Sequence, residues 1–311
     1  MSEEIITLPA FAKINLGLRV LGRRADGYHE IRTVFQTVTL HDTLSFEPAP
    51  GGRLELACTD PTIPTDESNL VLRAASLLRE RRGVSRGARA RLEKSIPAGG
   101  GLGGGSSDAA AALLALNYLW NLAADARELS ELGARLGADV PFFLTGGTAL
   151  GTGTGTDIKP LEDAPKRRLV VVTPSVRVST AEAYKALSAP ALTKADGVDN
   201  LSVSRTEADF PDSLCDVMSN DFEAVVVRLH PEVGRARDAL LGAGAVQASL
   251  SGSGSSVYGV FENELEAGRA ARQLGGAEAS WRVSACATLT RAEYVAALGA
   301  PAAILRPGGG A

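Results

Sequence analysis

Hydrophobic and polar residues alternate along the N-terminal segment 10–20. Its apolar positions include Ile14, Leu16, Leu18 and Val20. The positions between them carry Lys13, Asn15, Gly17 and Arg19. Successive side chains of a strand point to opposite faces, so this period of two predicts a strand with one buried face and one solvated face.

Longer apolar patterns predict the other elements of the first half. They indicate strands at 54–58 and 89–96 and helices at 69–82, 108–121 and 126–136. Helix 108–121 is apolar nearly all round, which predicts burial on every side. Gly137 is placed to end helix 126–136. The run 145–156 is rich in Gly and Thr and is compatible with a strand or a loop.

A break in the pattern separates two halves of the chain. Pro160, Pro165 and a charged cluster interrupt the regular elements between residues 157 and 167. The second half then shows strands at 168–173 and 257–261, helices at 180–187, 221–229 and 232–241, and an irregular stretch up to Asp216. Since single cores rarely exceed about 250–300 residues, we expect an N-terminal domain at 1–160, a second domain at 161–300 and a frayed tail at 301–311.

Composition narrows the classes of partner. Hydrophobic residues make up 45% and charged residues 22% of the 311 residues, as in an ordinary globular protein. The net charge is −4 and Lys and Arg form no long run, so neither nucleic acid nor a membrane surface is an expected partner. The longest apolar stretch, 109–116, is far shorter than the roughly 20 residues that a membrane-spanning helix needs.

The cysteines and the N-terminus indicate the compartment. Cys58, Cys215 and Cys286 are widely spaced and odd in number, which favours reduced thiols over a disulfide framework. They form no Cys/His motif typical of a structural metal site. Residues 1–4 are acidic and lack the layout of a signal peptide. A cytoplasmic location is therefore expected.

A glycine-rich turn precedes the buried helix. It consists of Pro97, Ala98, Gly99, Gly100, Gly101, Leu102, Gly103, Gly104, Gly105, Ser106 and Ser107. Without Cβ atoms the backbone can approach a ligand closely, and its N–H groups converge at a helix N-terminus, where the dipole favours an anion. The turn therefore predicts phosphate binding, rather than a flexible linker, because linkers rarely run straight into a buried helix. Ser106 and Ser107 can cap the helix or reach a phosphate or its Mg²⁺.

Two other phosphate-binding motifs fit the turn less well. A Walker A loop ends in Gly-Lys-Ser or Gly-Lys-Thr, and no lysine follows these glycines. Gly99, Gly101 and Gly104 satisfy the GxGxxG spacing of dinucleotide-binding folds. That motif also needs an acidic residue at the end of a second strand, about 20 residues further on. In this chain the corresponding stretch is the end of a helix.

Asp139 lies among apolar neighbours, two residues after the expected helix end at Gly137. Because Pro141 disfavours the helical region for the residue before it, Val140 is expected to be extended. A carboxylate held in such a setting needs a charged partner, although a turn or N-cap role is the alternative. From its place in the alternating segment, Lys13 is compatible with a solvated strand face.

Several segments resemble known kinases. Segment 97–108 resembles the central motif of the galactokinase–homoserine kinase–mevalonate kinase–phosphomevalonate kinase (GHMP) superfamily. Segments 12–16 (AKINL) and 24–30 (RADGYHE) are similar to motifs of the 4-diphosphocytidyl-2-C-methyl-D-erythritol kinase family. Segments 137–143 (GADVPFF) and 250–256 (LSGSGSS) lie where that family has its later motifs. The resemblance spans nearly the whole chain.

The resemblance implies an α+β fold with a two-domain GHMP-kinase-like architecture and an active site in the interdomain cleft. It implies ATP-dependent phosphorylation, with Mg²⁺, of the 2-hydroxyl of the cytidine-linked methylerythritol in the non-mevalonate isoprenoid pathway. It further implies that Lys13 and Asp139 are the catalytic pair. Asp139 would accept the proton of the attacking hydroxyl, and Lys13 would stabilise the negative charge. Ser106 and Ser107 are candidate Mg²⁺ ligands.

The resemblance also implies a substrate pocket. Its members would be Asn15, Tyr28, His29, Thr180, Tyr184, Gly252, Ser253 and Gly254, with Tyr28, His29 and Tyr184 around the cytosine ring. Tyr184 has the alternative of a core position, and Gly252–Gly254 that of a tight turn. Asn69 and Leu70 would line the adenine pocket, unless Asn69 is a helix N-cap.

Three other functions stay open. A sibling kinase for mevalonate, homoserine or a sugar would differ at segment 24–30. An NAD(P)-dependent oxidoreductase would need the missing second-strand acid. A non-catalytic nucleotide sensor would have lost Lys13 or Asp139, and both are present. The sequence carries no signal for the oligomeric state, and a homodimer is compatible with it.

Overall fold

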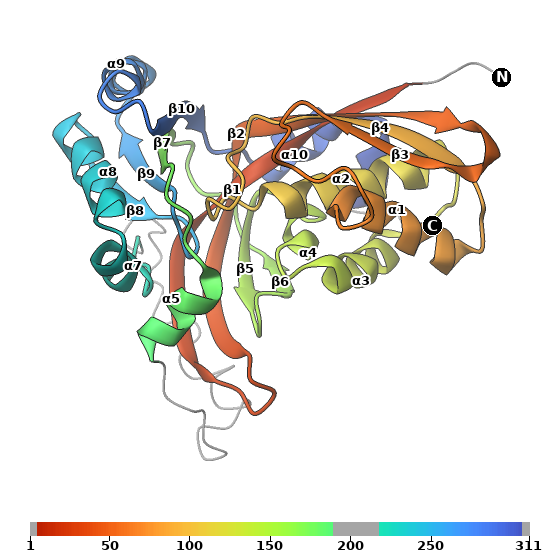
Figure 1. Ribbon diagram of the computed structural model, residues 1–311, viewed down its shortest axis with the longest axis horizontal. Helices are drawn as coiled ribbons and strands as arrows, with labels where there is room; N and C mark the ends of the chain where they lie inside the picture. Colours follow the sequence, from red (N-terminus) through yellow and green to blue (C-terminus); the bar gives the residue numbers. More distant parts are fainter. Residues whose placement is uncertain (1–4, 189–217, 307–311) are drawn as a thin grey trace.

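The chain builds a six-stranded sheet from its first half and a four-stranded sheet from its second half (Figure 1). The computed structural model describes residues 5–188 and 218–306. Cys215 and most of the predicted irregular stretch up to Asp216 lie outside the described residues. This mixed α+β architecture is the fold class expected from the sequence.

The first sheet is organised around one long hairpin. Its strands are β1 (Ile6–Arg23), β2 (His29–Ala49), β3 (Leu54–Cys58), β4 (Gly87–Glu93), β5 (Thr148–Thr152) and β6 (Asp157–Pro160). They follow the order β3-β4-β2-β5-β6, and β1 pairs antiparallel with β2 from Ile6↔Phe46 to Arg23↔His29. The helices below this sheet in Figure 1 are α1 (Leu70–Arg82), α2 (Gly104–Leu119), α3 (Ala126–Leu136) and α4 (Val140–Phe143).

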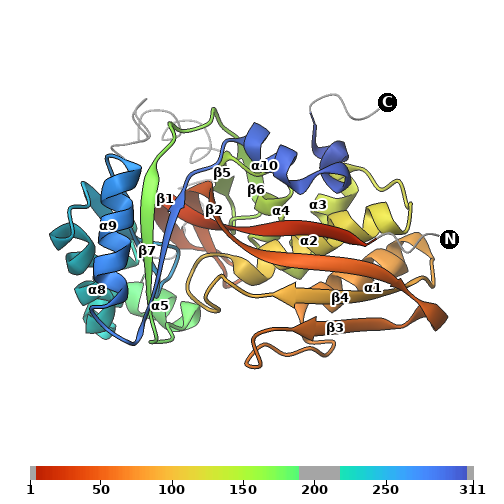
Figure 2. The same ribbon diagram turned by 90° about the horizontal axis from the view of Figure 1, so that it is seen from above.

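The second sheet is antiparallel throughout. Its strands are β7 (Arg168–Pro174), β8 (Gln247–Leu250), β9 (Val257–Phe261) and β10 (Trp281–Ala287), in the order β10-β7-β9-β8. Its helices are α5 (Thr180–Leu187), α7 (Glu223–Leu229), α8 (Pro231–Gly242) and α9 (Glu264–Gly275). In both views α8 and α9 lie on one side of β7 (Figures 1 and 2), and both helices pack on β7 and β9. Among the described residues, no helix combines the length and the apolar character needed to cross a membrane.

Strand β1 is buried on both faces. Its apolar side packs against the second sheet, where Ile14 belongs to a buried cluster with Leu169 and Tyr258. Its polar side is buried as well, with Lys13 only 4% exposed. The predicted solvated face is therefore wrong for Lys13, Asn15 and Gly17, because the glycine-rich turn and Asp139 lie against Lys13. Arg19, in contrast, is exposed. Lys13 N donates to Leu102 O at 2.9 Å.

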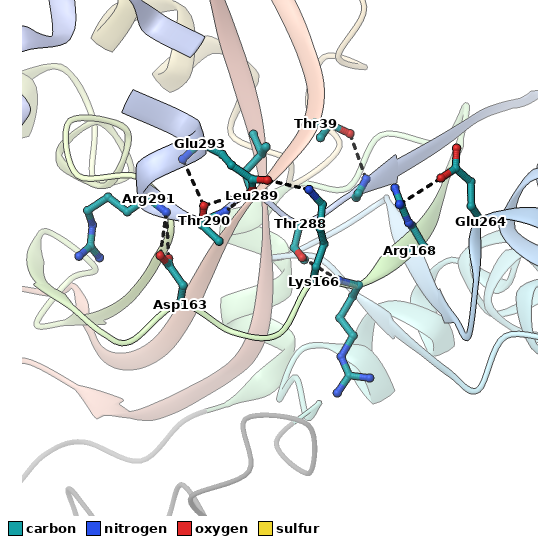
Figure 3. Close-up of polar contacts among 12 residues, drawn as sticks. Thr39, Asp163, Lys166, Arg168, Glu264, Thr288, Leu289, Thr290, Arg291 and Glu293 are labelled. Carbon is teal, nitrogen blue, oxygen red and sulfur yellow. Dashed lines mark hydrogen bonds and ion pairs between the residues drawn. The ribbon is translucent and has the colours of Figure 1, made fainter. Parts of the chain in front are cut away.

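Two connections join the halves and lie side by side (Figure 3). The outgoing segment 161–167 and the returning segment 287–290 exchange bonds, because Thr288 N donates to Arg167 O at 3.1 Å and Arg167 N donates to Thr288 Oγ1 at 2.9 Å. Asp163 accepts from Arg291 N at 3.0 Å, and Lys166 pairs with Glu293 at 2.7 Å. These bonds tie the two connections to each other beside β2.

The end of the chain returns to the first half. Helix α10 (Arg291–Leu298) packs into the N-terminal core through Tyr294, whose hydroxyl donates to Phe143 O. The 3₁₀ helix η3 (Ala300–Leu305) follows and buries Ala302 in the same core. These residues were expected in the second domain and in a frayed tail, but their apolar side chains complete the first core instead. The division near residue 160 stays a prediction.

Candidate functional site

A cleft of about 1430 Å³ opens between the two halves. It is bordered by the β1–β2 hairpin, the glycine-rich turn, the start of α4, helix α5 and the turn after β8. Thirteen of the residues singled out from the sequence line it: Lys13, Asn15, Tyr28, His29, Gly99, Gly101, Gly103, Asp139, Thr180, Tyr184, Gly252, Ser253 and Gly254. The fold thus brings motifs from both halves of the chain into one cavity.

Lys13 sits at the centre of a buried polar network. Its Nζ donates to Asn15 Oδ1 at 2.7 Å and lies 3.5 Å from Asp139 Oδ2. Asn15 Nδ2 donates to Thr33 Oγ1 at 2.7 Å, which fixes the amide. The ammonium also lies 5.4 Å from the centre of the Phe35 ring, within the range of a cation–π contact. Asn15 therefore fixes the position of the Lys13 ammonium, which lies next to the Asp139 carboxylate.

Asp139 is free to take part in chemistry. It is the N-cap residue of α4, but its side chain makes no capping hydrogen bond. Its side chain is 30% exposed in the cleft, so the expected apolar setting describes its neighbours and not the carboxylate itself. Val140 is the first residue of α4, and the expectation that it is extended was wrong. Proline is tolerated in the first helical turn, where its missing N–H leaves no bond unmade.

The glycine-rich turn is anchored through its carbonyl groups. Gly100 O accepts from Ser256 N at 3.0 Å, Gly101 O from Ser251 Oγ at 3.0 Å, and Leu102 O from Lys13 N at 2.9 Å. None of the N–H groups from Gly101 to Ser106 donates to another described residue. These donors therefore remain for an anion at the start of α2, where the helix dipole adds to them.

The two serines after the glycines differ in access. Both lie in the first two turns of α2, which begins at Gly104, earlier than the predicted helix. Ser106 lines a smaller cavity over the turn. Ser107 is 1% exposed and lines neither that cavity nor the cleft. Across residues 5–188 and 218–306 no group of three or more His, Cys, Asp or Glu side chains could hold a metal ion.

A second cavity of about 380 Å³ lies on the other side of the turn. Asn69 and Leu70 line it, together with Ile63 and most of the turn. Asn69 is also the N-cap of α1, because its Oδ1 accepts from Val71 N at 2.9 Å and its Nδ2 donates to Pro64 O at 2.7 Å. The N-cap alternative is therefore confirmed, and the adenine-pocket assignment stays a prediction.

A buried ionic cluster that the sequence did not suggest supports this turn. Lys94 Nζ pairs with Asp42 and with Asp108, at 2.9 Å from Asp108 Oδ2, and the three side chains are at most 6% exposed. Asp42 also accepts from the N–H groups of Ser95 and Ile96, just before the turn. One cation thus pairs with two carboxylates, and Asp108 Oδ1 has no hydrogen-bond partner among the described residues. Burial raises the pKa of Asp108 to about 7, with Lys94 opposing the shift.

This cluster predicts a pH-dependent stability. Because the pKa of Asp108 is higher in the folded than in the unfolded chain, its stabilisation is complete below about pH 4 and is lost as the pH rises through about 7. Relative to Asp108→Asn, the wild type should lose about 1–3 kcal/mol of unfolding free energy between pH 5 and 8. Urea denaturation at several pH values measures this. Asp238→Asn on exposed α8 is the control, and parallel curves for wild type and Asp108→Asn would contradict the prediction.

Aromatic residues gather at the far end of the cleft. His29 stacks on Tyr184 with ring centres 4.3 Å apart and planes 16° apart, and Tyr184 meets Phe222 edge-on at 4.8 Å. Burial and then the charge of Asp139 raise the pKa of Tyr184 to about 12, so its hydroxyl is protonated. Burial and then Arg23 lower the pKa of His29, which favours a neutral ring. Tyr28 is 67% exposed at the rim.

The turn after β8 lies beside Lys13. A Cβ on Gly252 would stand 3.4 Å from Lys13 Nζ and 3.2 Å from Gly101 O. Ser253 Oγ is 2.8 Å from Thr180 Oγ1, which ties this turn to α5. The turn therefore touches the glycine-rich turn at one end and the aromatic end of the cleft at the other.

Sequence reasoning missed several supporting residues. Thr33 and Phe35 on β2 hold Asn15 and Lys13, and Tyr258 on β9 donates its hydroxyl to Asn15 O at 2.9 Å. The β-branched and aromatic residues of segment 31–35 were a signal for β2, but they did not reveal which face met Lys13.

Known proteins resemble this chain along most of its length. The profiles of the GHMP kinases N terminal domain and of the GHMP kinases C terminal region match residues 69–147 and 207–279. A 4-diphosphocytidyl-2-C-methyl-D-erythritol kinase of Prosthecochloris aestuarii is 44% identical over 270 residues, covering 86% of this chain and 93% of that protein. One of Pelotomaculum thermopropionicum is 44% identical over 265 residues, covering 85% and 92%.

A solved structure agrees with these relatives. The crystal structure of a 4-(cytidine 5'-diphospho)-2C-methyl-D-erythritol kinase superposes with a TM-score of 0.73 at 39% identity, covering 91% of this chain and 99% of that one. GHMP kinases use ATP to phosphorylate small molecules, which agrees with the glycine-rich turn that borders the cleft. The chain therefore belongs to the 4-diphosphocytidyl-2-C-methyl-D-erythritol kinase family of the GHMP kinases.

Proposed function

We propose that this protein transfers the γ-phosphoryl group of ATP to the 2-hydroxyl of 4-diphosphocytidyl-2-C-methyl-D-erythritol, within non-mevalonate isoprenoid synthesis. The observation that carries the proposal is the Lys13–Asp139 pair, 3.5 Å apart and placed between an anion-binding turn and an aromatic cluster. The names of the relatives supply the acceptor. A homodimer and a cytoplasmic location stay predictions.

The geometry suits an in-line transfer. The triphosphate binds the N–H groups of the glycine-rich turn, and its adenine enters the cavity lined by Asn69 and Leu70. The acceptor hydroxyl lies next to Asp139, which takes its proton as the oxygen attacks the γ-phosphorus. The ADP oxygen leaves with the electron pair of the broken P–O bond. Lys13 stabilises the charge that develops on the transferring oxygens.

One hydroxyl of this chain is placed to hold Mg²⁺ at the same site. Ser106 lines the cavity over the turn and offers a hydroxyl, so it is the residue of this chain placed to hold the ion together with ATP phosphates. Ser107 is buried and does not suit this role. When bound, the ion would neutralise part of the triphosphate charge.

The cytosine ring is proposed to stack at the aromatic end. The His29 and Tyr184 rings, 4.3 Å apart, leave no space for a base between them, so one ring must turn aside when a base enters. Tyr28, exposed at the rim, can then close over the base. The neutral His29 ring can donate or accept at the edge of the base.

A panel of acceptors tests the proposal. ADP release is measured with ATP and 4-diphosphocytidyl-2-C-methyl-D-erythritol, and in parallel with mevalonate, homoserine and galactose. We expect release with the cytidine-linked acceptor alone. Release with another acceptor, and none with the cytidine-linked one, would overturn the substrate assignment and keep the kinase chemistry.

Tyr184 should govern acceptor binding more than catalysis. Tyr184→Ala removes a stacking surface worth about 1–3 kcal/mol, so the KM for the cytidine-linked acceptor should rise roughly 5–150-fold. Tyr184→Phe keeps the ring and should stay close to wild type. Steady-state kinetics of both variants measure the contrast. A rise in the KM for ATP instead would contradict the prediction and assign Tyr184 to the nucleotide site.

A further inference from the structure

Four consecutive residues, Asn220 to Glu223, lie behind the cleft, and their side chains contact four different parts of it. Asn220 bonds the turn after β8, Asp221 bonds β1, Phe222 packs on Tyr184, and Glu223 bonds β8. We call these residues the 220–223 bracket. The reaction described above uses none of them directly.

The Asn220 amide makes three hydrogen bonds. Its Nδ2 donates to Leu250 O at 2.9 Å and to Gly252 O at 2.8 Å, and its Oδ1 accepts from Phe222 N at 3.0 Å. An asparagine amide has two N–H groups, so both donors and one acceptor site are engaged. The side chain is 9% exposed. The two Nδ2 bonds fix the backbone on both sides of Ser251, and the bond from Phe222 N fixes the amide itself.

The backbone held in this way forms one wall of the reaction centre. Gly252 lies against Lys13 Nζ and Gly101 O, close enough that a Cβ there would touch both. Ser251 Oγ donates to Gly101 O at 3.0 Å, which links the same turn to the glycine-rich turn. A shift of Gly252 would therefore alter the space in which the phosphoryl group moves.

The bracket is also tied to the strand that carries Lys13. Leu18 N donates to Ser219 O at 2.8 Å, and Asp221 N donates to Leu18 O at 3.0 Å. Val20 N donates to Asp221 Oδ2 at 2.8 Å. The bracket thus spans from β1 to the turn after β8, and it sets the distance between two parts of the site that come from different halves of the chain.

We propose that Asn220 is a positioning residue for phosphoryl transfer, which holds the Gly252 backbone in register with Lys13 and the glycine-rich turn. The inference rests on the proposed kinase function. Misplacing a reacting group by about 1 Å can reduce turnover roughly 10²-fold. Loss of the Asn220 bonds should therefore reduce kcat more than it weakens the binding of either substrate.

The test compares Asn220→Ala and Asn220→Ser with Asn117→Ala. Asn117 is a matched control, because its buried amide also bonds the backbone, at 3.0 Å to Ala124 O and 2.9 Å from Ala124 N, near the far end of α2. We expect the Asn220 variants to lose roughly 10–100-fold in kcat with much smaller changes in either KM. Asn117→Ala should lose thermal stability with an unchanged kcat.

Several outcomes decide the inference. An unchanged kcat in the folded Asn220 variants, at a stability loss like that of Asn117→Ala, would overturn it. Asn220→Ser keeps an oxygen that can accept from Phe222 N. If Asn220→Ala does not fold, the kcat of Asn220→Ser decides the inference. All variants are assayed with whichever acceptor the wild type phosphorylates in the panel above, so a wrong substrate assignment would not affect the result.

Discussion

Asp139→Asn is expected to lower kcat by roughly 10²–10⁴-fold while nucleotide binding stays close to wild type. The asparagine has nearly the same shape but cannot accept the proton of the attacking hydroxyl. Lys13 remains held, because its 2.7 Å bond to Asn15 does not involve Asp139. The glycine-rich turn is anchored by Ser251, Ser256 and the Lys13 N–H, so the phosphate site should keep its form.

Two measurements separate these effects. Steady-state ADP release gives kcat, and calorimetric titration with ADP gives the nucleotide affinity. Asp238→Asn controls for the loss of one negative charge, because the Asp238 side chain on α8 is 66% exposed. Normal turnover in Asp139→Asn would remove Asp139 from the role of base. A parallel loss of ADP affinity would assign it to the nucleotide site instead.

Local motifs made part of the site predictable. The glycine-rich turn and the helix after it could be inferred because all the relevant groups are contiguous, and the resemblance to GHMP kinases rests on them. Helices α3 and α5 and strands β3 and β9 begin and end where the hydrophobic pattern places them. The N-cap alternative for Asn69 was also available from sequence, because capping depends only on neighbouring residues.

The long strand β2 was not predicted, and the reason is physical. Sequence patterns identify a strand when one face meets water. Strand β2 is buried on both faces over much of its length, and its interior includes Thr33 and Thr37, both 0% exposed. Their hydroxyls bond the backbone of distant segments, at Gly17 O and Gly147 O. A polar residue with such a partner looks solvent-exposed in the sequence.

The remaining gaps concern contacts between distant segments. From the residues alone, Lys13 fitted a solvated strand face, and only the resemblance placed it beside Asp139. The 220–223 bracket and the Lys94 cluster join segments that have no common local pattern. Each consists of ordinary residue types whose importance depends on partners brought close by the fold. Their contribution therefore becomes visible only with the three-dimensional structure.

Gly101→Ala is expected to raise the KM for ATP more than 10-fold and to lower the unfolding free energy by about 2–5 kcal/mol. Gly101 has φ +78°, where a side chain costs about 1–2 kcal/mol. A Cβ there would also lie 2.1 Å from Ser251 O and 3.1 Å from Gly254 O. Both atoms are backbone and cannot rotate away, so the turn itself must move.

Gly99→Ala separates the two causes. Gly99 has a similar φ of +70°, but a Cβ there would meet nothing within 4 Å. It should therefore lose only the roughly 1–2 kcal/mol of the left-handed conformation and keep most of its affinity for ATP. Thermal denaturation, KM for ATP and the stabilisation by added ADP are measured for both variants. Equal effects would mean that backbone conformation alone matters. A larger effect of Gly101→Ala would show that the turn binds phosphate only while it packs against Ser251 and Gly254 of the second half.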